Sequence, residues 1–244
     1  MNERILSCRD VTMRFGGVTA LNKVSLDLPG NQVTGVIGPN GSGKSTLFNV
    51  LSAERRPTLG EVIWGGQPIV GMPPYRVASL GVVRTYQSAS VFPELTVRES
   101  MEFAHWTARK RGSRSIADVA DLTGLAMFMN EPCRALPYGH QKILGVALGL
   151  LTGPKMLLLD EPAAGLNQSE VARFLRLIKD IRSAHDVGIG IIDHDMGLIM
   201  PACDRIAVLN FGNLIAFGTP AEIRSNRSVL DIYLSGDLRS DAGH

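Results

Sequence analysis

Short, strand-like segments rich in apolar residues occur at intervals along the chain, at residues 33–37, 82–86, 155–161 and 188–194, the last two with polar residues at their ends. Runs of this length are typical of strands that are covered on both faces, as in a parallel sheet. Segments with apolar residues at helical spacing lie between them, at residues 47–51, 96–124, 142–151 and 169–185. Strands and helices that alternate in this way predict an α/β fold around a right-handed parallel sheet.

Both ends of the chain add strands of another kind. Apolar and polar positions alternate roughly over residues 5–13 and 23–28, and residues 61–64 form a further strand-like run. These half-buried patterns predict antiparallel β structure in the N-terminal part. A β-hairpin is predicted near the other end, with strands at residues 206–209 and 214–217.

Composition and charge narrow the class of protein. The chain has 244 residues, of which 45% are hydrophobic and 20% charged, as in an ordinary globular protein of one large or two small domains. A formal net charge of +2 gives no general attraction to nucleic acid. Three cysteines (Cys8, Cys133 and Cys203) are widely spaced and follow no metal-ligand pattern, which favours a reducing, cytosolic setting.

The sequence pattern indicates neither a membrane-spanning segment nor a signal peptide. No run of about 18 apolar residues occurs, and residues 1–4 lack the apolar core of a signal peptide. Any action at a membrane is therefore expected to go through a partner. A basic run at Arg109, Lys110, Arg111 and Arg114 is either a solvated helix end or a contact with a partner or lipid headgroups.

A glycine-rich stretch between the first apolar run and a helical segment fits the pattern of a phosphate-binding loop. Glycines allow backbone N–H groups to wrap a polyphosphate, and the start of the helix adds partial positive charge. Lys44 would reach the terminal phosphates of a nucleotide, and the Ser45 hydroxyl would hold Mg²⁺. The stretch consists of Gly38, Pro39, Asn40, Gly41, Ser42, Gly43, Lys44, Ser45 and Thr46.

Polar residues follow the ends of the other apolar runs: Gln87, then Asp160 and Glu161, then His194. Because ligands bind at the carboxyl ends of parallel strands, we expect these residues to cluster around a triphosphate. Asp160 suits Mg²⁺, while Glu161 suits a general base or a residue that orients the attacking water. Gln87 can bridge metal and water through its amide oxygen. His194 can hydrogen-bond the γ-phosphate and the attacking water.

With these motifs in place, the sequence resembles the ATP-binding subunit of an ABC transporter, an ATPase with a P-loop NTPase fold. The matching motifs follow the family's order: Walker A at residues 38–46, the Q-loop at Gln87, the signature at 136–141, Walker B at 156–161, the D-loop at 163–167 and the switch histidine at His194. The resemblance covers nearly the whole chain.

The family likeness implies roles for further residues and a division of the chain. Phe15 would stack on adenine, and Pro137, Tyr138, Gly139 and His140 would face an ATP molecule held by a second subunit. The likeness also implies a RecA-like parallel sheet core with an N-terminal antiparallel β-subdomain, formed by residues 1–87 and 153–244. Residues 88–152 would form a helical subdomain.

Several details are similar to importers of the branched-chain amino acid type, a branch that also includes urea, amide and aromatic-acid importers. They include Phe15-Gly16-Gly17, Pro162-Ala163-Ala164-Gly165-Leu166-Asn167 and Asp193-His194-Asp195-Met196. This branch implies four partners: ATP, a second ABC ATPase in a homo- or heterodimer, transmembrane permease subunits and, indirectly, an external solute-binding protein. It also implies a peripheral position on the cytoplasmic side of the inner membrane, where Gln87 and residues 88–99 would meet the permease.

The signature departs from the usual Leu-Ser-Gly-Gly-Gln, because Pro137 replaces the serine and Tyr138 the first glycine. Proline cannot donate the hydrogen bond that the serine gives to the γ-phosphate, a loss on the order of 1–3 kcal/mol. Asn167 also stands where the D-loop commonly has Asp. One hypothesis is a pair of unequal sites, the partner ATPase carrying the stronger signature.

Two other classes of protein stay open at this point. One is a soluble ABC ATPase without transport, as in iron–sulfur assembly or translation control. The other is the ATPase of a lipid or polysaccharide exporter, which is similar in outline but lacks the Leu-Pro-Tyr-Gly and Asp-His-Asp-Met features of this sequence.

Overall fold

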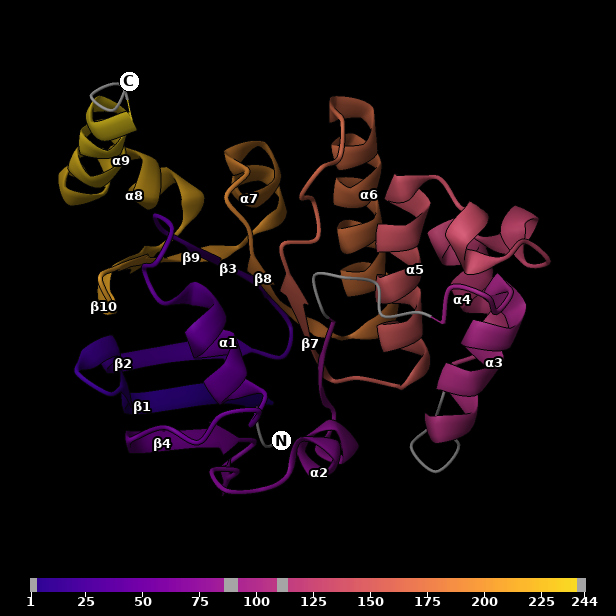
Figure 1. Ribbon diagram of the computed structural model, residues 1–244, viewed down its shortest axis with the longest axis horizontal. Coiled ribbons are helices and arrows are strands. Elements are labelled where there is room, and N and C mark those ends of the chain that lie inside the picture. Colours follow the sequence, from indigo (N-terminus) through magenta and orange to yellow (C-terminus); the bar gives the residue numbers. More distant parts are fainter. Residues whose placement is uncertain (1–3, 86–91, 109–113, 241–244) are drawn as a thin grey trace.

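The computed structural model describes residues 4–85, 92–108 and 114–240 (Figure 1). Within them the strands form two sheets. An antiparallel sheet has the order β2-β1-β4-β5, with β1 at Ile5–Phe15, β2 at Val18–Pro29, β4 at Leu59–Trp64 and β5 at Gln67–Pro68. The antiparallel pairing predicted for the N-terminal strands is confirmed, although these strands form a sheet of their own.

The central sheet has the order β10-β9-β3-β8-β7-β6. Its strands are β3 at Val33–Ile37, β6 at Val82–Arg84, β7 at Met156–Asp160, β8 at Gly188–Ile192, β9 at Arg205–Asn210 and β10 at Asn213–Gly218. All neighbours in it are parallel except β9 and β10. The predicted parallel sheet and the predicted C-terminal hairpin are both confirmed.

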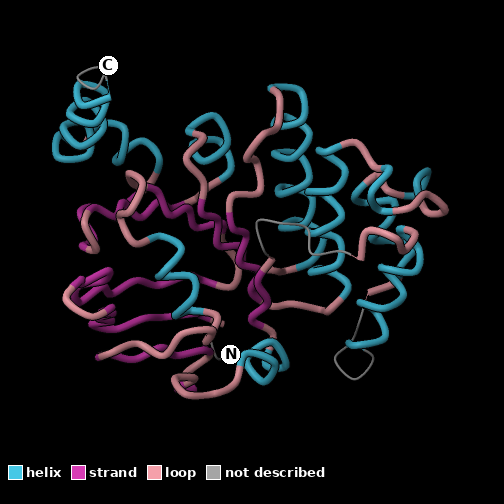
Figure 2. The backbone as a smooth tube through the Cα atoms, viewed as in Figure 1, coloured by secondary structure: helices cyan, strands magenta, loops and turns pink. Residues whose placement is uncertain are grey.

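The continuous apolar runs are explained by burial on both faces of the central sheet. On β7, Leu157 and Leu159 pack into the core under the long helices, while Met156 and Leu158 pack into the core shared with the antiparallel sheet. Helix α1 (Lys44–Leu51) lies in this second core, between the two sheets (Figure 2). Both faces therefore need apolar side chains, which removes the alternation of a half-buried strand.

The remaining helices are α2 (Pro74–Leu80), α3 (Val97–Ala108), α4 (Ile116–Thr123), α5 (Tyr138–Leu151), α6 (Gln168–His185), α7 (Met196–Ala202), α8 (Pro220–Ser225) and α9 (Arg227–Ser240), with 3₁₀ turns at Ala126–Phe128 and Cys133–Ala135. Figure 2 shows α3, α4, α5 and α6 gathered at the side of the central sheet away from the antiparallel strands, while α2 lies beside those strands and packs into their core through Val77. None of the helices in the described ranges has the length and apolar character needed to span a membrane. The division into a core and a helical subdomain stays a prediction.

Two helix predictions need correction. The pattern over residues 96–124 belongs to two helices, because Ser115 caps a new helix by accepting from the backbone N–H of Asp118. Helix α5 begins at Tyr138 rather than at Lys142. Its first turn is polar, so its apolar periodicity starts late, and the extended backbone of Pro137 marks the true boundary.

Candidate nucleotide-binding site

The phosphate loop joins β3 to α1, and its backbone can be built only with glycine at two positions. A Cβ on Gly38 would clash with the carbonyl oxygen of Leu209, and one on Gly43 would lie 2.5 Å from that of Ala20. Both glycines have positive φ, at 151° and 107°. Gly43 also provides no side-chain cap for α1, which leaves N–H groups of the first helical turn for an anion.

Two side chains of the loop also fit a phosphate ligand. Lys44 is only 7% exposed, and its Nζ donates to the carbonyl oxygens of Gly38 at 2.8 Å and Pro39 at 3.0 Å. The Ser42 hydroxyl is buried without a hydrogen-bond partner in the described part of the chain. A polyphosphate would provide acceptors for both groups. Ser45 is exposed and Thr46 half-buried at the start of α1, while Asn40 and Gly41 are exposed at the tip of the loop.

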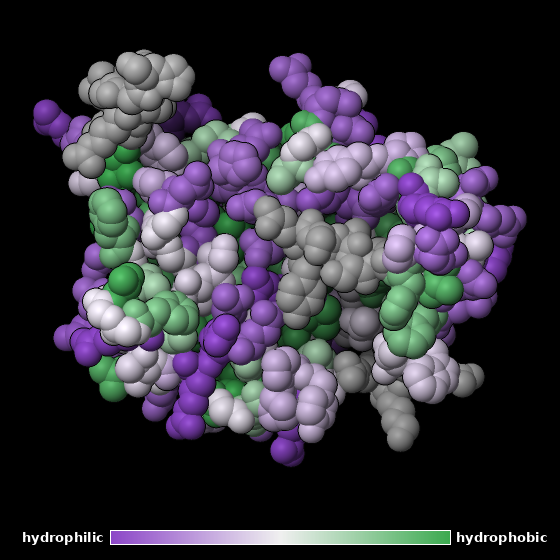
Figure 3. All heavy atoms as spheres, viewed as in Figure 1, coloured by the Kyte–Doolittle hydropathy of each residue, from purple (hydrophilic) through white to green (hydrophobic). Residues whose placement is uncertain are grey.

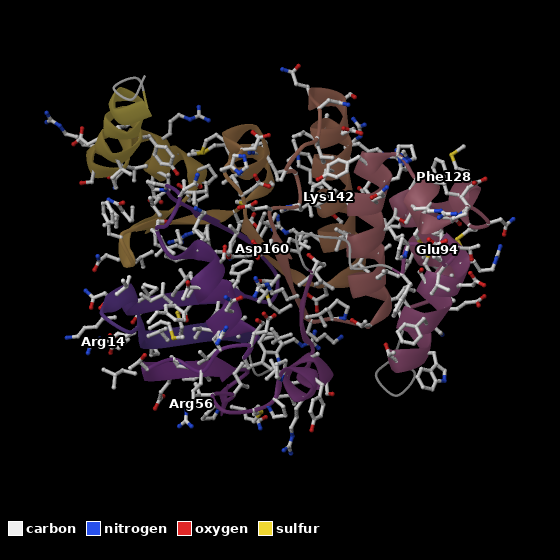
Figure 4. All side chains as sticks on the ribbon, viewed as in Figure 1. Arg14, Arg56, Glu94, Phe128, Lys142 and Asp160 are labelled. Carbon is white, nitrogen blue, oxygen red and sulfur yellow. The ribbon has the colours of Figure 1, made fainter. Side chains whose placement is uncertain are left out.

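Burial lowers the pKa of Lys44, and the nearby carboxylates Glu161 and Asp160 partly offset this effect. The same three groups therefore lie near one another at the edge of the sheet. Glu161 stands directly after β7, and its N–H donates to the carbonyl oxygen of Ile192 at the end of β8. Figure 4 places Asp160 in the middle of the view, beside α1.

The strand register explains why these groups meet. Asp160 pairs with Ile192, and Val36 near the end of β3 pairs with the same residue. Ile37, Asp160 and Ile192 thus end their parallel strands at one edge, as the sequence predicted for Lys44, Ser45, Asp160, Glu161 and His194. Gln87 lies outside the described residues, as do Arg109, Lys110 and Arg111.

Asp160 has a partner that the sequence did not reveal. Arg84, the last residue of β6, donates from Nη2 to the Asp160 carboxylate at 2.5 Å. Its Nη1 donates to the Asn49 side chain of α1 at 2.5 Å and to Glu54 at 3.2 Å. The side chains of Arg84 and Asp160 are only 7% and 11% exposed. One buried guanidinium therefore ties β6, β7 and α1 together beneath the proposed metal ligand.

His194 is an exposed side chain on a firmly held backbone. Its imidazole is 66% exposed, and Nδ1 lies 3.8 Å from the carboxylate of Asp193. Asp193 itself is fully buried and accepts the N–H of His194 at 2.8 Å. The histidine ring is thus free to meet a ligand at the edge of the sheet while its main chain stays fixed.

Phe15 is nearly half exposed at the end of β1, a position that leaves its ring open to a flat ligand.

Tyr138 begins α5, and its hydroxyl donates to the carbonyl oxygen of Ala164 at 3.2 Å. A Cβ on Gly139 would lie 2.5 Å from Glu170 Oε1, so this glycine permits close packing against α6. Glu170 and Asn167 form a capping box at the start of that helix.

His140 completes the contact between α5 and α6. Its Nε2 lies 2.8 Å from Arg173, and its ring packs against Phe128 with centroids 4.6 Å apart. Burial and then the Arg173 charge lower the pKa of this histidine. Tyr138 therefore packs on the D-loop segment of its own chain, while Gly139 and His140 pack on α6. Figure 1 shows the first turn of α5 well apart from α1, so one chain does not bring its signature and its phosphate loop together.

Comparisons with known proteins agree on one family. The family profile described as ABC transporter matches residues 21–164. The high-affinity branched-chain amino acid transport ATP-binding protein BraF of Pseudomonas aeruginosa is 39% identical, over 96% of this chain and 99% of its own. The corresponding LivG protein of Escherichia coli strain K12 is 38% identical with the same coverage.

Solved structures give the same result. An ATP-binding cassette of an ABC transporter in its ADP conformation superposes with a TM-score of 0.85 at 25% identity, covering 95% of this chain and 98% of that one. A dimeric bacterial ABC transporter cassette, at 22% identity and a TM-score of 0.77 over 88% of this chain and 98% of its own, shares the fold.

Proposed function

The chain belongs to the family of ABC transporter ATP-binding subunits, ATPases that power transport, and from this premise we propose that it drives the import of branched-chain amino acids or a related small solute such as urea, an amide or an aromatic acid. The observation that carries the solute class is the 38–39% identity to BraF and LivG along nearly the entire length of all three chains.

The phosphate loop would bind the β- and γ-phosphates of ATP. Lys44 would exchange its two loop carbonyl acceptors for phosphate oxygens, and the N–H groups of the first turn of α1 would add further donors. Phe15 would stack on the adenine ring. Glu161 would polarise the attacking water as general base, and His194 would hydrogen-bond the γ-phosphate. Gln87 is expected to complete these active-site contacts by bridging the metal and the attacking water through its amide oxygen.

The donor set at the edge of the sheet fits Mg²⁺. Ser45 and Asp160 provide a hydroxyl and a carboxylate oxygen, and Mg²⁺ typically takes one or two such protein ligands together with phosphate oxygens. No group of three or more His, Cys, Asp or Glu side chains forms a metal cluster among the described residues, which accords with a metal bound mainly by nucleotide and water. When bound, the ion would neutralise part of the negative charge of the phosphates.

A composite site with a second ATPase subunit would complete the arrangement. The signature residues Pro137, Tyr138, Gly139 and His140 lie apart from the phosphate loop of the same chain, so they would contact ATP held by a partner. The N-terminal turn of α5 is suited to this contact, because a helix start attracts phosphate. Unequal sites remain a hypothesis: mutation of Gly139 and of its counterpart in the partner would then cause unequal losses of ATPase activity.

The proposed docking site for a permease includes Phe92 before α3 and the exposed side of that helix, at the cytoplasmic face of the membrane. Phe92, Phe103 and Trp106 are largely exposed there, and their rings contact one another, with centroids 6.0 and 6.5 Å apart. Apolar surface appears in green over α3 in Figure 3. Exposed aromatic groups of this kind are enriched in protein interfaces, and this one adjoins the segment 88–99 that we expect to meet the permease.

The test is transport in vesicles. The chain is purified with its permease subunits and partner ATPase, placed in liposomes with ATP inside, and supplied outside with the binding protein and labelled leucine, urea or an aromatic acid. ATP-dependent uptake of one of these solutes is expected. Efflux of lipid or polysaccharide would identify an exporter instead, and failure to co-purify with any multispanning protein would identify a soluble ATPase.

A further inference from the structure

Asp193 is a fully buried residue directly after β8, and its carboxylate reaches the loop that follows the neighbouring strand β7. Its Oδ1 accepts the N–H of His194 at 2.8 Å and that of Asp195 at 3.0 Å. Its Oδ2 accepts the N–H of Ala163 at 3.1 Å. All three donors are backbone groups, so the carboxylate's hydrogen bonds hold the main chain, while the His194 ring lies beyond hydrogen-bond distance at 3.8 Å.

The three hydrogen bonds join two loops. Ala163 lies two residues after Glu161 in the loop that leaves β7, and His194 lies in the loop that leaves β8. A second link runs in the same place, because the Glu161 N–H donates to the carbonyl oxygen of Ile192 at 2.8 Å. Glu161 itself has a φ of 45°, a strained conformation for a residue with a side chain, which persists only where its surroundings hold it.

We propose that Asp193 is a positioning residue that sets Glu161 and His194 in register with each other for hydrolysis. The proposal rests on the functions assigned above to those two side chains. One buried carboxylate can satisfy three N–H donors through two oxygens, and charge-assisted bonds of this kind are short and directional. Asp193 thereby couples the loop that carries Glu161 to the loop that carries His194. In this proposal Asp193 itself does not contact the nucleotide.

Asparagine has nearly the same shape but only one acceptor oxygen. In Asp193→Asn that oxygen would still accept the N–H groups of His194 and Asp195. The new NH₂ is a donor and would face the N–H of Ala163, so this hydrogen bond would be lost. The two loops would then lose their shared anchor. Asp195→Asn is the matched control, because Asp195 caps α7 by accepting the Gly197 N–H at 2.7 Å and asparagine caps a helix equally well.

The experiment measures Mg-ATP hydrolysis by the assembled transporter. Asp193→Asn is expected to lower kcat by roughly 10- to 100-fold, the range for misplacement of a catalytic group by about 1 Å, with KM for ATP within about twofold. Asp195→Asn is expected to retain the wild-type kcat. An unchanged kcat in Asp193→Asn, or an equal loss in both variants, would overturn the proposal.

Two further variants make the test specific. In a His194→Ala background, Asp193→Asn is expected to cost less than it does in the wild type, because residues that act as one unit are not additive; a full additive loss contradicts the proposal. If Asp193→Asn does not fold, Asp193→Ser replaces it, since its hydroxyl is too short to reach Ala163, and the same kcat loss is expected. A wild-type complex without ATPase activity would instead refute the proposed function.

Discussion

The ion pair between Arg84 and Asp160 yields a prediction whose size follows from its burial. In Arg84→Met the methionine fills the space of the arginine stem, but the carboxylate of Asp160 loses its 2.5 Å partner while only 11% exposed. Asn49 and Glu54 lose the same guanidinium. Removing one member of a buried pair typically costs about 3–5 kcal/mol, because a charge stays buried without compensation.

Arg134→Met is the matched control. Arg134 and Glu94 form an ion pair at 3.0 Å with side chains that are 64% and 71% exposed. Water screens such a pair, so its loss is expected to cost between 0 and about 1 kcal/mol. Both variants remove an arginine from an ion pair with a carboxylate, so they differ mainly in how deeply that pair is buried.

The assay is urea unfolding of each variant without nucleotide, followed by circular dichroism, with thermal unfolding as a second measure. Arg84→Met is expected to lower the free energy of unfolding by about 3–5 kcal/mol, and the melting temperature by roughly 6–20 °C. Equal and small losses in the two variants would refute the reasoning, since they would show that Asp160 is not buried against Arg84.

Three more outcomes can be checked. Glu161→Gln is expected to bind Mg-ATP and accumulate as a closed dimer with its partner in size-exclusion chromatography; a monomer in saturating Mg-ATP would speak against its role as base. Tyr138→Phe removes the hydrogen bond to Ala164, worth about 0.5–1.5 kcal/mol, and is expected to slow ATP turnover by about 2- to 10-fold, whereas Tyr75→Phe on exposed α2 leaves turnover unchanged. Ala53 has a φ of 60°, so Ala53→Gly is expected to stabilise the fold by about 0.5–1 kcal/mol in urea unfolding; a loss of stability would show that packing outweighs this strain.

The phosphate loop and the central sheet could be predicted from the sequence because both depend on local pattern. Strand β7, at Met156–Asp160, is buried on two faces, which requires an unbroken apolar run, and the polar residues at its carboxyl end must lie at the sheet edge. Gly212 with Phe211 likewise forms the left-handed turn of the hairpin, with φ of 76° and 43°.

Contacts between distant residues could not be predicted in this way. Asp193 looks like an ordinary polar residue beside a histidine, and only the meeting of β7 and β8 turns it into an anchor for Ala163. Arg84 lies 76 residues from Asp160 in the sequence. The apolar pattern predicts the start of α5 too late, because its first turn packs through Tyr138 on the D-loop and through Gly139 on α6 rather than through large apolar side chains.

The most direct measurement of the central claim is ATP binding and hydrolysis by Lys44→Ala. Lys44 is the cation of the phosphate loop, and loss of a charged hydrogen-bond donor to phosphate costs about 1.5–3 kcal/mol. We predict that the wild-type assembly hydrolyses Mg-ATP, whereas the variant binds ATP on the order of 100-fold more weakly and releases no phosphate. Hydrolysis at the wild-type rate by Lys44→Ala would contradict a nucleotide site at this edge of the sheet.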